Sequence, residues 1–313
     1  ALKQLLFFWP SVFGGRTPDL LTSKTGFLGE AINRAGLQGT ININSRDTLR
    51  DIANEIEWAK VSQIGPTDYL TELDNRAAKP RVNAEQVAQV YTAYESIKRQ
   101  ELAMDFEDVL LLTTAMLEEE REVRERVQDQ YRYFTVDEYQ DVSPLQQRLL
   151  NLWLGSRQEI CVVGDAAQTI YSFAGATSNF LLNFQNRFPN AQVFRLSRGY
   201  RSTPEIINTA NAILRAANLV SDHGSELQSA NAHGEKPAVN GFNSTQDEIS
   251  YVVGEVVKSI SNGVDSSQIA VLARTNAQLD QVKSALNNAR IPSQIRSGER
   301  FFDRTDVRDV MRI

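Results

Sequence analysis

Two adjacent acids at the end of an apolar run are the first residues that could do chemistry. The run 133–136 ends abruptly in Asp137 and Glu138. Carboxylates at the end of a buried strand are costly, since burial penalises their charged form, unless a metal or a proton transfer needs them. In a nucleotide hydrolase, Asp137 would hold Mg²⁺ and Glu138 would orient and deprotonate the attacking water. The alternative is an ordinary strand end whose acids cap a following helix.

A neutral amide and two aromatic residues follow the next apolar run. The run 160–163 ends in Gly164 and Asp165, and Gln168, Tyr171 and Phe173 come after it. The amide of Gln168 is suited to sensing a phosphate without carrying charge. The rings of Tyr171 and Phe173 could stack on nucleobases, a contact that tolerates any sequence. The alternative is that both rings pack in a core between domains.

An arginine beside a tyrosine follows the third apolar run, residues 192–196. Arg201 stands just before a predicted helix N-terminus at Thr203 and Pro204, where it could reach a γ-phosphate as an arginine finger. The ring of Tyr200 could cover an adenine. The alternative is a solvated or structural arginine.

The elements that must position these groups are predicted to be parallel strands joined by crossover helices. Short apolar runs that alternate with helical stretches indicate this arrangement, and ligands then bind beyond the carboxyl ends of the strands. A helix is predicted over 105–125, and another runs from the N-cap Thr203 to about residue 217.

Helices and one further strand are predicted in the flanking segments. The first hundred residues are predicted to be helical from the spacing of their apolar positions. Residues 221–244 form a polar stretch that predicts a surface loop. A helix with apolar positions from 249 to 260, a strand over 269–273, a helix over 278–289 and a helical end complete a second α/β unit.

Composition limits the class of protein. A chain of 313 residues with 42% hydrophobic and 23% charged residues is expected to form about two globular domains. No apolar run is long enough for a membrane span. The single Cys161 and the two histidines exclude an internal disulfide and a Cys/His zinc cluster, so a cytoplasmic location is expected. A net charge of −6 argues against a purely electrostatic nucleic-acid binder and favours a local groove.

In this order and spacing, the three groups resemble the UvrD/PcrA/Rep family of superfamily 1 DNA helicases. Residues 137–141 resemble the family's Walker B box, 164–176 its motif III and 200–202 its motif IV. Residues 269–278, with 298–302 later, are similar to the segment that precedes the large insertion of the second motor domain. A weaker similarity at 57–60 lies in the helical first third.

The resemblance implies an α/β fold with two RecA-like parallel-sheet motor domains, both incomplete, and a helical insertion of the family's 1B type. The implied domains are 1–102, mainly helical with a short remnant of the first motor domain, then 103–196 and 197–313. The implied activity is ATP-dependent translocation from 3′ to 5′ on single-stranded DNA with unwinding of duplex junctions, in repair or replication. ATP and Mg²⁺ are the implied cofactors.

The residues of this chain that match the family's motifs take the following roles by resemblance. Those expected to act in catalysis are Asp137, which also holds the metal, Glu138, Gln168 and Arg201. Those expected to bind the nucleotide are Asp165, Gln168, Tyr200 and Arg201. Those expected to contact DNA are Tyr171, Phe173, Arg274 and Asn276, the last two at the carboxyl end of a strand.

The sequence also departs from the family pattern. It has no Gly-x-x-x-x-Gly-Lys loop to cradle phosphates. The nearest candidate, Ser23-Lys24-Thr25, has Ser23 and Pro18 at the glycine positions, and no strand is predicted before it. The chain is therefore expected to be an internal piece of a helicase that does not hydrolyse ATP by itself. In motif III, Phe173 and Ala174 replace the usual Trp and Arg, so stacking is kept and one cationic contact is lost.

Two other classes stay open at this point. One is a catalytically inert DNA-binding or protein-docking relative, and the other is the motor subunit of a helicase–nuclease complex. The presence of all four expected catalytic residues favours an active parent protein, because mutation without selection for activity would not be expected to keep all four.

Overall fold

The computed structural model describes residues 1–73, 80–217 and 226–295. The predicted helical end, the motif at 298–302 and the first residues of the predicted loop 221–244 lie outside these ranges. The chain divides into two compact units, Ala1–Gly234 and Glu235–Ile313, and each is described by itself. No helix among the described residues is long and apolar enough to cross a membrane.

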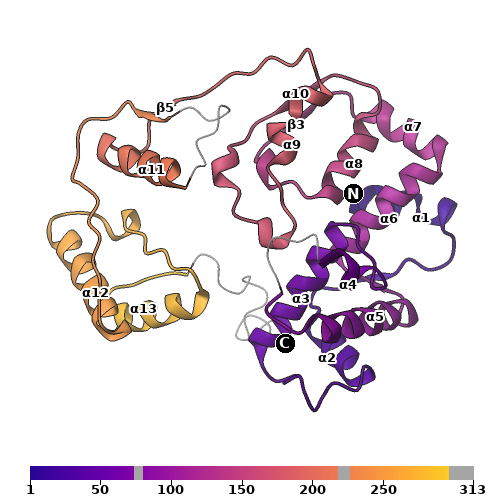
Figure 1. Cartoon of the computed structure of the whole chain (residues 1–313), viewed down its shortest axis with the longest axis horizontal. Helices are drawn as coiled ribbons and strands as arrows, with labels where there is room; N and C mark the ends of the chain where they lie inside the picture. The colour runs from indigo at the N-terminus through magenta and orange to yellow at the C-terminus, as the bar shows by residue number, and fades with distance from the viewer. Residues whose placement is uncertain (74–79, 218–225, 296–313) are drawn as a thin grey trace, which may run out of the picture. The chain divides into compact units, whose positions relative to one another are not determined.

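The first hundred residues are mainly helical, as their apolar spacing predicts (Figure 1). The helices are α1 (Leu2–Val12), α2 (Thr25–Arg34), α3 (Arg46–Val61), α4 (Tyr69–Glu72) and α5 (Ala84–Gln100). The apolar faces of α2, α3 and α5 share one buried cluster that includes Ile32, Ile52 and Tyr94. The side chains of Ser45 and Asn83 cap α3 and α5 by accepting hydrogen bonds from backbone N–H groups of the first turn.

A buried group of ion pairs ties α3 and α5 to the start of α6 (Phe106–Glu119). Lys60 donates to both carboxylate oxygens of Asp105, at 2.7 and 2.8 Å, and Lys98 donates to Asp105 at 2.9 Å. The lysine side chains are 2% exposed and that of Asp105 is fully buried. Burial alone would raise the pKa of Asp105, but Lys60 and Lys98 outweigh it and hold this pKa well below its ordinary value.

The predicted helix 105–125 is wrong in its extent, since the chain forms two helices here. The helix α6 ends at Glu119, and α7 (Arg121–Gln130) begins after Glu120, whose backbone is extended. Consecutive glutamates are unfavourable at the negative end of a helix dipole. Arg124 instead donates to the carbonyl oxygens of Leu117 and Glu118, at 2.8 and 3.0 Å, and so satisfies the free end of α6.

The two strands that carry the predicted site are present and parallel. The strands β3 (Phe134–Val136) and β4 (Ile160–Val162) pair with Thr135 opposite Cys161. Between them, the crossover helix α8 (Pro144–Leu154) begins with a capping box formed by Ser143 and Gln146. The helix α8 packs against α6 and α7. The parallel pairs and their crossover helix confirm the predicted α/β class.

Short turns and helices follow the two strands. The 3₁₀ turn η2 (Tyr139–Asp141) follows β3, and η3 (Ala166–Gln168) and η4 (Ser172–Ala174) follow β4. The short helices α9 (Asn179–Leu182) and α10 (Phe184–Arg187) come next, and α9 lies against η2. The side chains predicted to act in the site are therefore carried on tight turns beyond the carboxyl ends of a parallel pair.

Two further parallel pairs occur among the described residues, and each has very short strands. The strand β1 (Asp19–Leu20) pairs with β2 (Ala103–Met104), and β5 (Arg198–Gly199) pairs with β6 (Gln228–Ser229). The strand β1 corrects the expectation that no strand precedes Lys24. The helix α11 (Pro204–Ala216) follows β5 and begins after Thr203, as predicted.

The predicted strand 192–196 does not form, and Val193, Phe194 and Leu196 are exposed. A strand needs a neighbour that takes up its backbone hydrogen bonds, and no described strand pairs with this segment. The apolar run alone therefore did not suffice to predict a strand.

The second unit contains α12 (Thr245–Ser261), the turn η5 (Ser266–Gln268) and α13 (Asn276–Asn288). Both helices occupy the predicted segments and pack against each other, with Ile249 and Val256 of α12 buried. The predicted strand 269–273 is absent for the same reason as 192–196, since no described strand pairs with it.

Candidate functional site

The two acids predicted to be catalytic lie in the turn that follows β3. Asp137 and Glu138 are both exposed. Glu138 has a φ of 50°, in the left-handed region that side chains other than glycine rarely adopt, at a cost of about 1–2 kcal/mol. Oδ1 of Asp137 accepts a hydrogen bond from the Glu138 N–H at 2.9 Å. Such strain is common where function fixes a side chain. Neither acid caps α8, whose N-cap is Ser143.

A buried glutamine joins this turn to the loop after β4. Nε2 of Gln140 donates to Oε2 of Glu138 at 2.7 Å, and its Oε1 accepts from the Asp165 N–H at 3.0 Å. Oδ2 of Asp165 in turn accepts from Nε2 of Gln168 at 2.9 Å. The structure therefore brings the predicted residues Glu138, Asp165 and Gln168 into one hydrogen-bonded network. Gln140 was not predicted, because its neighbours are known only once the two strands are paired.

The two predicted stacking residues are on the surface. Tyr171 is 51% exposed and Phe173 is 55% exposed, and their ring centroids are 6.2 Å apart. The turn that carries them packs against α3. Gly175 ends this turn with a φ of 91°, and a Cβ there would lie 2.6 Å from Cγ2 of Val61. More than half of each residue is therefore exposed, which argues against the alternative that both rings are core residues.

Tyr200 and Arg201 lie between β5 and α11, and both are exposed. Their backbone is held by hydrogen bonds to neighbouring carbonyl groups. Ser229 Oγ donates to the Ser202 carbonyl at 2.6 Å, and Asn231 Nδ2 donates to the Tyr200 carbonyl at 3.1 Å. Within the described part of the chain, no hydrogen bond or ion pair joins Arg201 to the network of Glu138 and Gln168.

Arg274 and Asn276 lie in the second unit, at the start of α13. Arg274 is exposed, and Asn276 is the first residue of the helix. Thr275 is the N-cap and forms a capping box with Gln278. The prediction that these residues stand at the carboxyl end of a strand is wrong, since residues 269–273 are not paired. They stand instead at a helix N-terminus.

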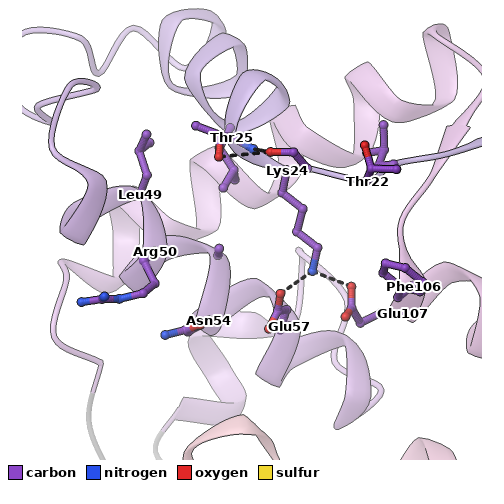
Figure 2. A pocket seen from close by; sticks show the side chains of 13 residues that line it. Thr22, Lys24, Thr25, Leu49, Arg50, Asn54, Glu57, Phe106 and Glu107 are labelled. Atoms are coloured by element: carbon purple, nitrogen blue, oxygen red, sulfur yellow. Dashed lines mark hydrogen bonds and ion pairs between the residues drawn. The ribbon is translucent and has the colours of Figure 1, made fainter. Parts of the chain in front are cut away.

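A separate pocket of about 650 Å³ surrounds Lys24, between α2, α3 and α6. Figure 2 shows the ammonium group of Lys24 between two carboxylates, Glu57 at 2.5 Å and Glu107 at 2.7 Å. Burial lowers the pKa of Lys24, but Glu107 and Glu57 outweigh it and raise this pKa. Burial also raises the pKa of Glu107. A lysine neutralised by two acids is unsuited to binding phosphate, which supports the prediction that residues 23–25 are not a phosphate loop.

Two helicase domain families match the chain. The UvrD/REP helicase N-terminal domain matches residues 21–189, and the UvrD-like helicase C-terminal domain matches residues 194–313. The first match alone covers more than half of the chain and includes β3, β4 and the network between them. The chain belongs to the UvrD/REP helicase family.

Its similarity to individual relatives covers most of the chain, and the chain spans less than half of the length of each relative. The ATP-dependent DNA helicase UvrD2 of Mycobacterium tuberculosis is 42% identical over 99% of this chain and 44% of its own length. The ATP-dependent DNA helicase PcrA of Leuconostoc citreum is 33% identical over 84% of this chain and 34% of its own length. PcrA of Staphylococcus aureus is 31% identical over the same share of this chain and 34% of its own length.

Proposed function

We propose that the whole protein is an ATP-dependent translocase that moves from 3′ to 5′ on single-stranded DNA and unwinds duplex junctions, in repair or replication. The network that joins Glu138, Asp165 and Gln168 beyond two parallel strands carries this proposal. It supports nucleotide hydrolysis because ligands of such sheets bind beyond the carboxyl ends of the strands. The relatives, which are named as DNA helicases, support DNA as the polymer.

Asp137 fits a role as ligand of Mg²⁺. Mg²⁺ prefers carboxylate oxygens and is often held by one or two acids together with substrate phosphates. One oxygen of Asp137 accepts the Glu138 N–H, and the side chain is exposed, so an oxygen is available to a metal. When bound with ATP, Mg²⁺ would neutralise charge that develops on the phosphates.

Glu138 is proposed to orient the attacking water and take its proton. Its carboxylate is held by Gln140, and the residue is exposed. Gln168 is proposed to contact the γ-phosphate through its amide, which is held by Asp165. Arg201 is proposed to stabilise charge on the same phosphate, and the exposed ring of Tyr200 to cover the adenine.

On the DNA side, the exposed rings of Tyr171 and Phe173 are proposed to stack on successive bases. Arg274 and Asn276 are proposed to contact the DNA backbone. The start of α13 supports this role, since free N–H groups at a helix N-terminus favour phosphate. The proposed domains are the helical 1B-like segment 1–102 and the two motor parts 103–196 and 197–313.

Three further proposals concern this chain and its setting. The chain by itself is proposed to be inactive in hydrolysis, because its sequence has no phosphate loop. The unpaired Cys161 supports a cytoplasmic location. The side chains of Glu138 and Gln168 are held by specific partners, which favours an active enzyme over a catalytically inert relative.

The polarity of the motor is tested by unwinding. The whole protein is mixed with ATP, Mg²⁺ and a labelled duplex that carries either a 3′ or a 5′ single-stranded tail. Strand separation is expected only with the 3′ tail and only with ATP. Equal unwinding of both substrates would refute the polarity, and DNA binding without ATP-dependent unwinding would favour the inert relative.

A further inference from the structure

No step of the hydrolysis proposed above is assigned to Gln140 itself, yet this residue lies at the centre of the network. Its side chain is 1% exposed. A buried amide needs partners for both its N–H and its C=O groups. Here the two main partners belong to different loops, one after β3 and one after β4.

The two contacts of Gln140 fix the catalytic acid relative to the backbone beyond β4. Its N–H group donates to Glu138 at 2.7 Å, and its oxygen accepts from the Asp165 N–H at 3.0 Å. Because the amide is planar and rigid, a shift of the Asp165 backbone moves the group that holds the Glu138 carboxylate. The backbone of Glu138 is strained, with a φ of 50°, and such a conformation persists only where surrounding contacts hold it. The contact from Gln140 is one of these.

Gly164 provides the space that this contact needs. A Cβ at Gly164 would lie 2.6 Å from Oε1 of Gln140 and 3.2 Å from its backbone nitrogen. The φ of Gly164 is not in the left-handed region, so close approach rather than backbone conformation requires glycine here. A side chain at this position would press on the Gln140 amide, and also on Leu181, whose Cδ2 would lie 3.0 Å from the Cβ.

From Asp165 the contacts continue to the proposed phosphate sensor. Oδ1 of Asp165 accepts from the Ala167 N–H at 3.0 Å, and Oδ2 accepts from Gln168 Nε2 at 2.9 Å. The turn with Tyr171 and Phe173 follows directly along the chain. A movement at the proposed DNA contacts therefore has a short covalent and hydrogen-bonded route to Glu138.

We propose that Gln140 is a positioning residue that sets the Glu138 carboxylate according to the position of the loop 164–168, and so makes hydrolysis depend on DNA. The inference rests on the proposed function, since it requires Glu138 to act on water. Gln140 acts only through Glu138 and Asp165 and touches no reacting atom.

Two substitutions at Gln140 separate its two contacts. Gln140→Leu removes both, whereas Gln140→Glu keeps the acceptor for the Asp165 N–H and places a carboxylate against Glu138. In the whole protein, both variants are expected to lower the DNA-stimulated kcat of ATP hydrolysis about 10- to 100-fold, the usual effect of losing a supporting partner. The KM for ATP and the affinity for single-stranded DNA are expected to stay within about twofold, since Gln140 contacts neither.

Hydrogen exchange of the 164–168 backbone supplies a measurement that does not need ATP. Gln140→Leu is expected to speed exchange at Asp165 about tenfold, because its N–H loses its acceptor, and Gln140→Glu is expected to leave it unchanged. Gly164→Ala should behave like Gln140→Leu. Gly29→Ala is the matched control, since a Cβ at Gly29 meets no atom within 4 Å.

The outcomes separate the two proposals. An unchanged kcat in Gln140→Leu would overturn the positioning role of Gln140. A fall in kcat that comes with a lower affinity for ATP and DNA and a lower melting temperature would also overturn it, because it would indicate a general structural loss. Fast hydrogen exchange of the Asp165 N–H in both Gln140 variants would show that Gln140→Glu does not keep the acceptor for this group, and would overturn the separation of the two contacts. A wild-type protein without DNA-stimulated hydrolysis would refute the proposed function, and exchange at Asp165 would still decide whether Gln140 joins the loops.

Discussion

Removing the ring of Phe173 separates a DNA-stacking role from a structural role. If the ring stacks on a base, Phe173→Ala in the whole protein should weaken binding of single-stranded DNA by about 1–3 kcal/mol, the usual worth of one stacked base. This corresponds to a loss of affinity of about 5- to 150-fold. The loss should not depend on the base sequence, since every base has a face on which to stack.

The exposure of the ring limits the cost in stability. Full burial of a phenylalanine side chain is worth up to about 3 kcal/mol, and Phe173 is 55% exposed, so less than half of this is at stake. The free energy of unfolding should therefore fall by no more than about 1.4 kcal/mol. A buried aromatic ring would cost about 3–5 kcal/mol on the same change.

Melting temperature and DNA affinity are measured on the same preparation. Tyr133→Ala is the matched control, because Tyr133 is 82% exposed and lies outside the turn that carries Phe173. The control should change neither quantity by much. A large drop in melting temperature with unchanged DNA affinity in Phe173→Ala would refute the stacking role.

Three further outcomes follow from the described contacts. Asp105→Asn should lower the free energy of unfolding by about 3–5 kcal/mol near neutral pH, because it leaves two buried lysines without this partner. The folded state holds the pKa of Asp105 low, so the stability difference between wild type and variant should be complete above the unfolded pKa of about 3.9 and should shrink as the pH falls below that value. Denaturant unfolding from pH 7 to pH 2 measures this difference. A difference that stays constant over this range would contradict the prediction. Gly175→Ala should lower the free energy of unfolding by at least about 1 kcal/mol, because the φ of Gly175 is 91° and a Cβ there would overlap Val61 of α3. Gly29→Ala, the control, should be neutral or stabilising. Equal melting temperatures of the two variants would refute this prediction. This chain alone should release no phosphate from ATP above a Glu138→Gln control, even with single-stranded DNA, and a clear excess would show that hydrolysis needs no added phosphate loop.

Sequence patterns predicted the strands and helices whose caps, turns or apolar spacing lie within the segment itself. The run 133–136 and the run 160–163 each end in polar residues, and they form β3 and β4 in parallel. Thr203 and Pro204 mark the start of α11, and the apolar spacing of 249–260 predicts α12. In each case a cap or a periodicity lies within the segment itself, so the sequence is sufficient.

Features that depend on distant partners could not be predicted. The runs 192–196 and 269–273 have the composition of strands, but no described strand pairs with either. Arg124 donates to carbonyl groups at the end of α6, a contact that sequence spacing does not reveal. Gln140 joins two loops only because β3 and β4 lie side by side, and its amide has no signature that distinguishes it from a surface glutamine.

The most direct test of the proposed catalytic site is ATP hydrolysis by the whole protein and its Glu138→Gln variant, with and without single-stranded DNA. Wild type should hydrolyse ATP faster with DNA. The variant should lose about 10²- to 10⁴-fold in kcat, the usual contribution of a general base, and should still bind ATP, because Asp137 and its charge are kept. Equal turnover in the two proteins would remove Glu138 from the catalytic role and contradict the site proposed beyond β3 and β4.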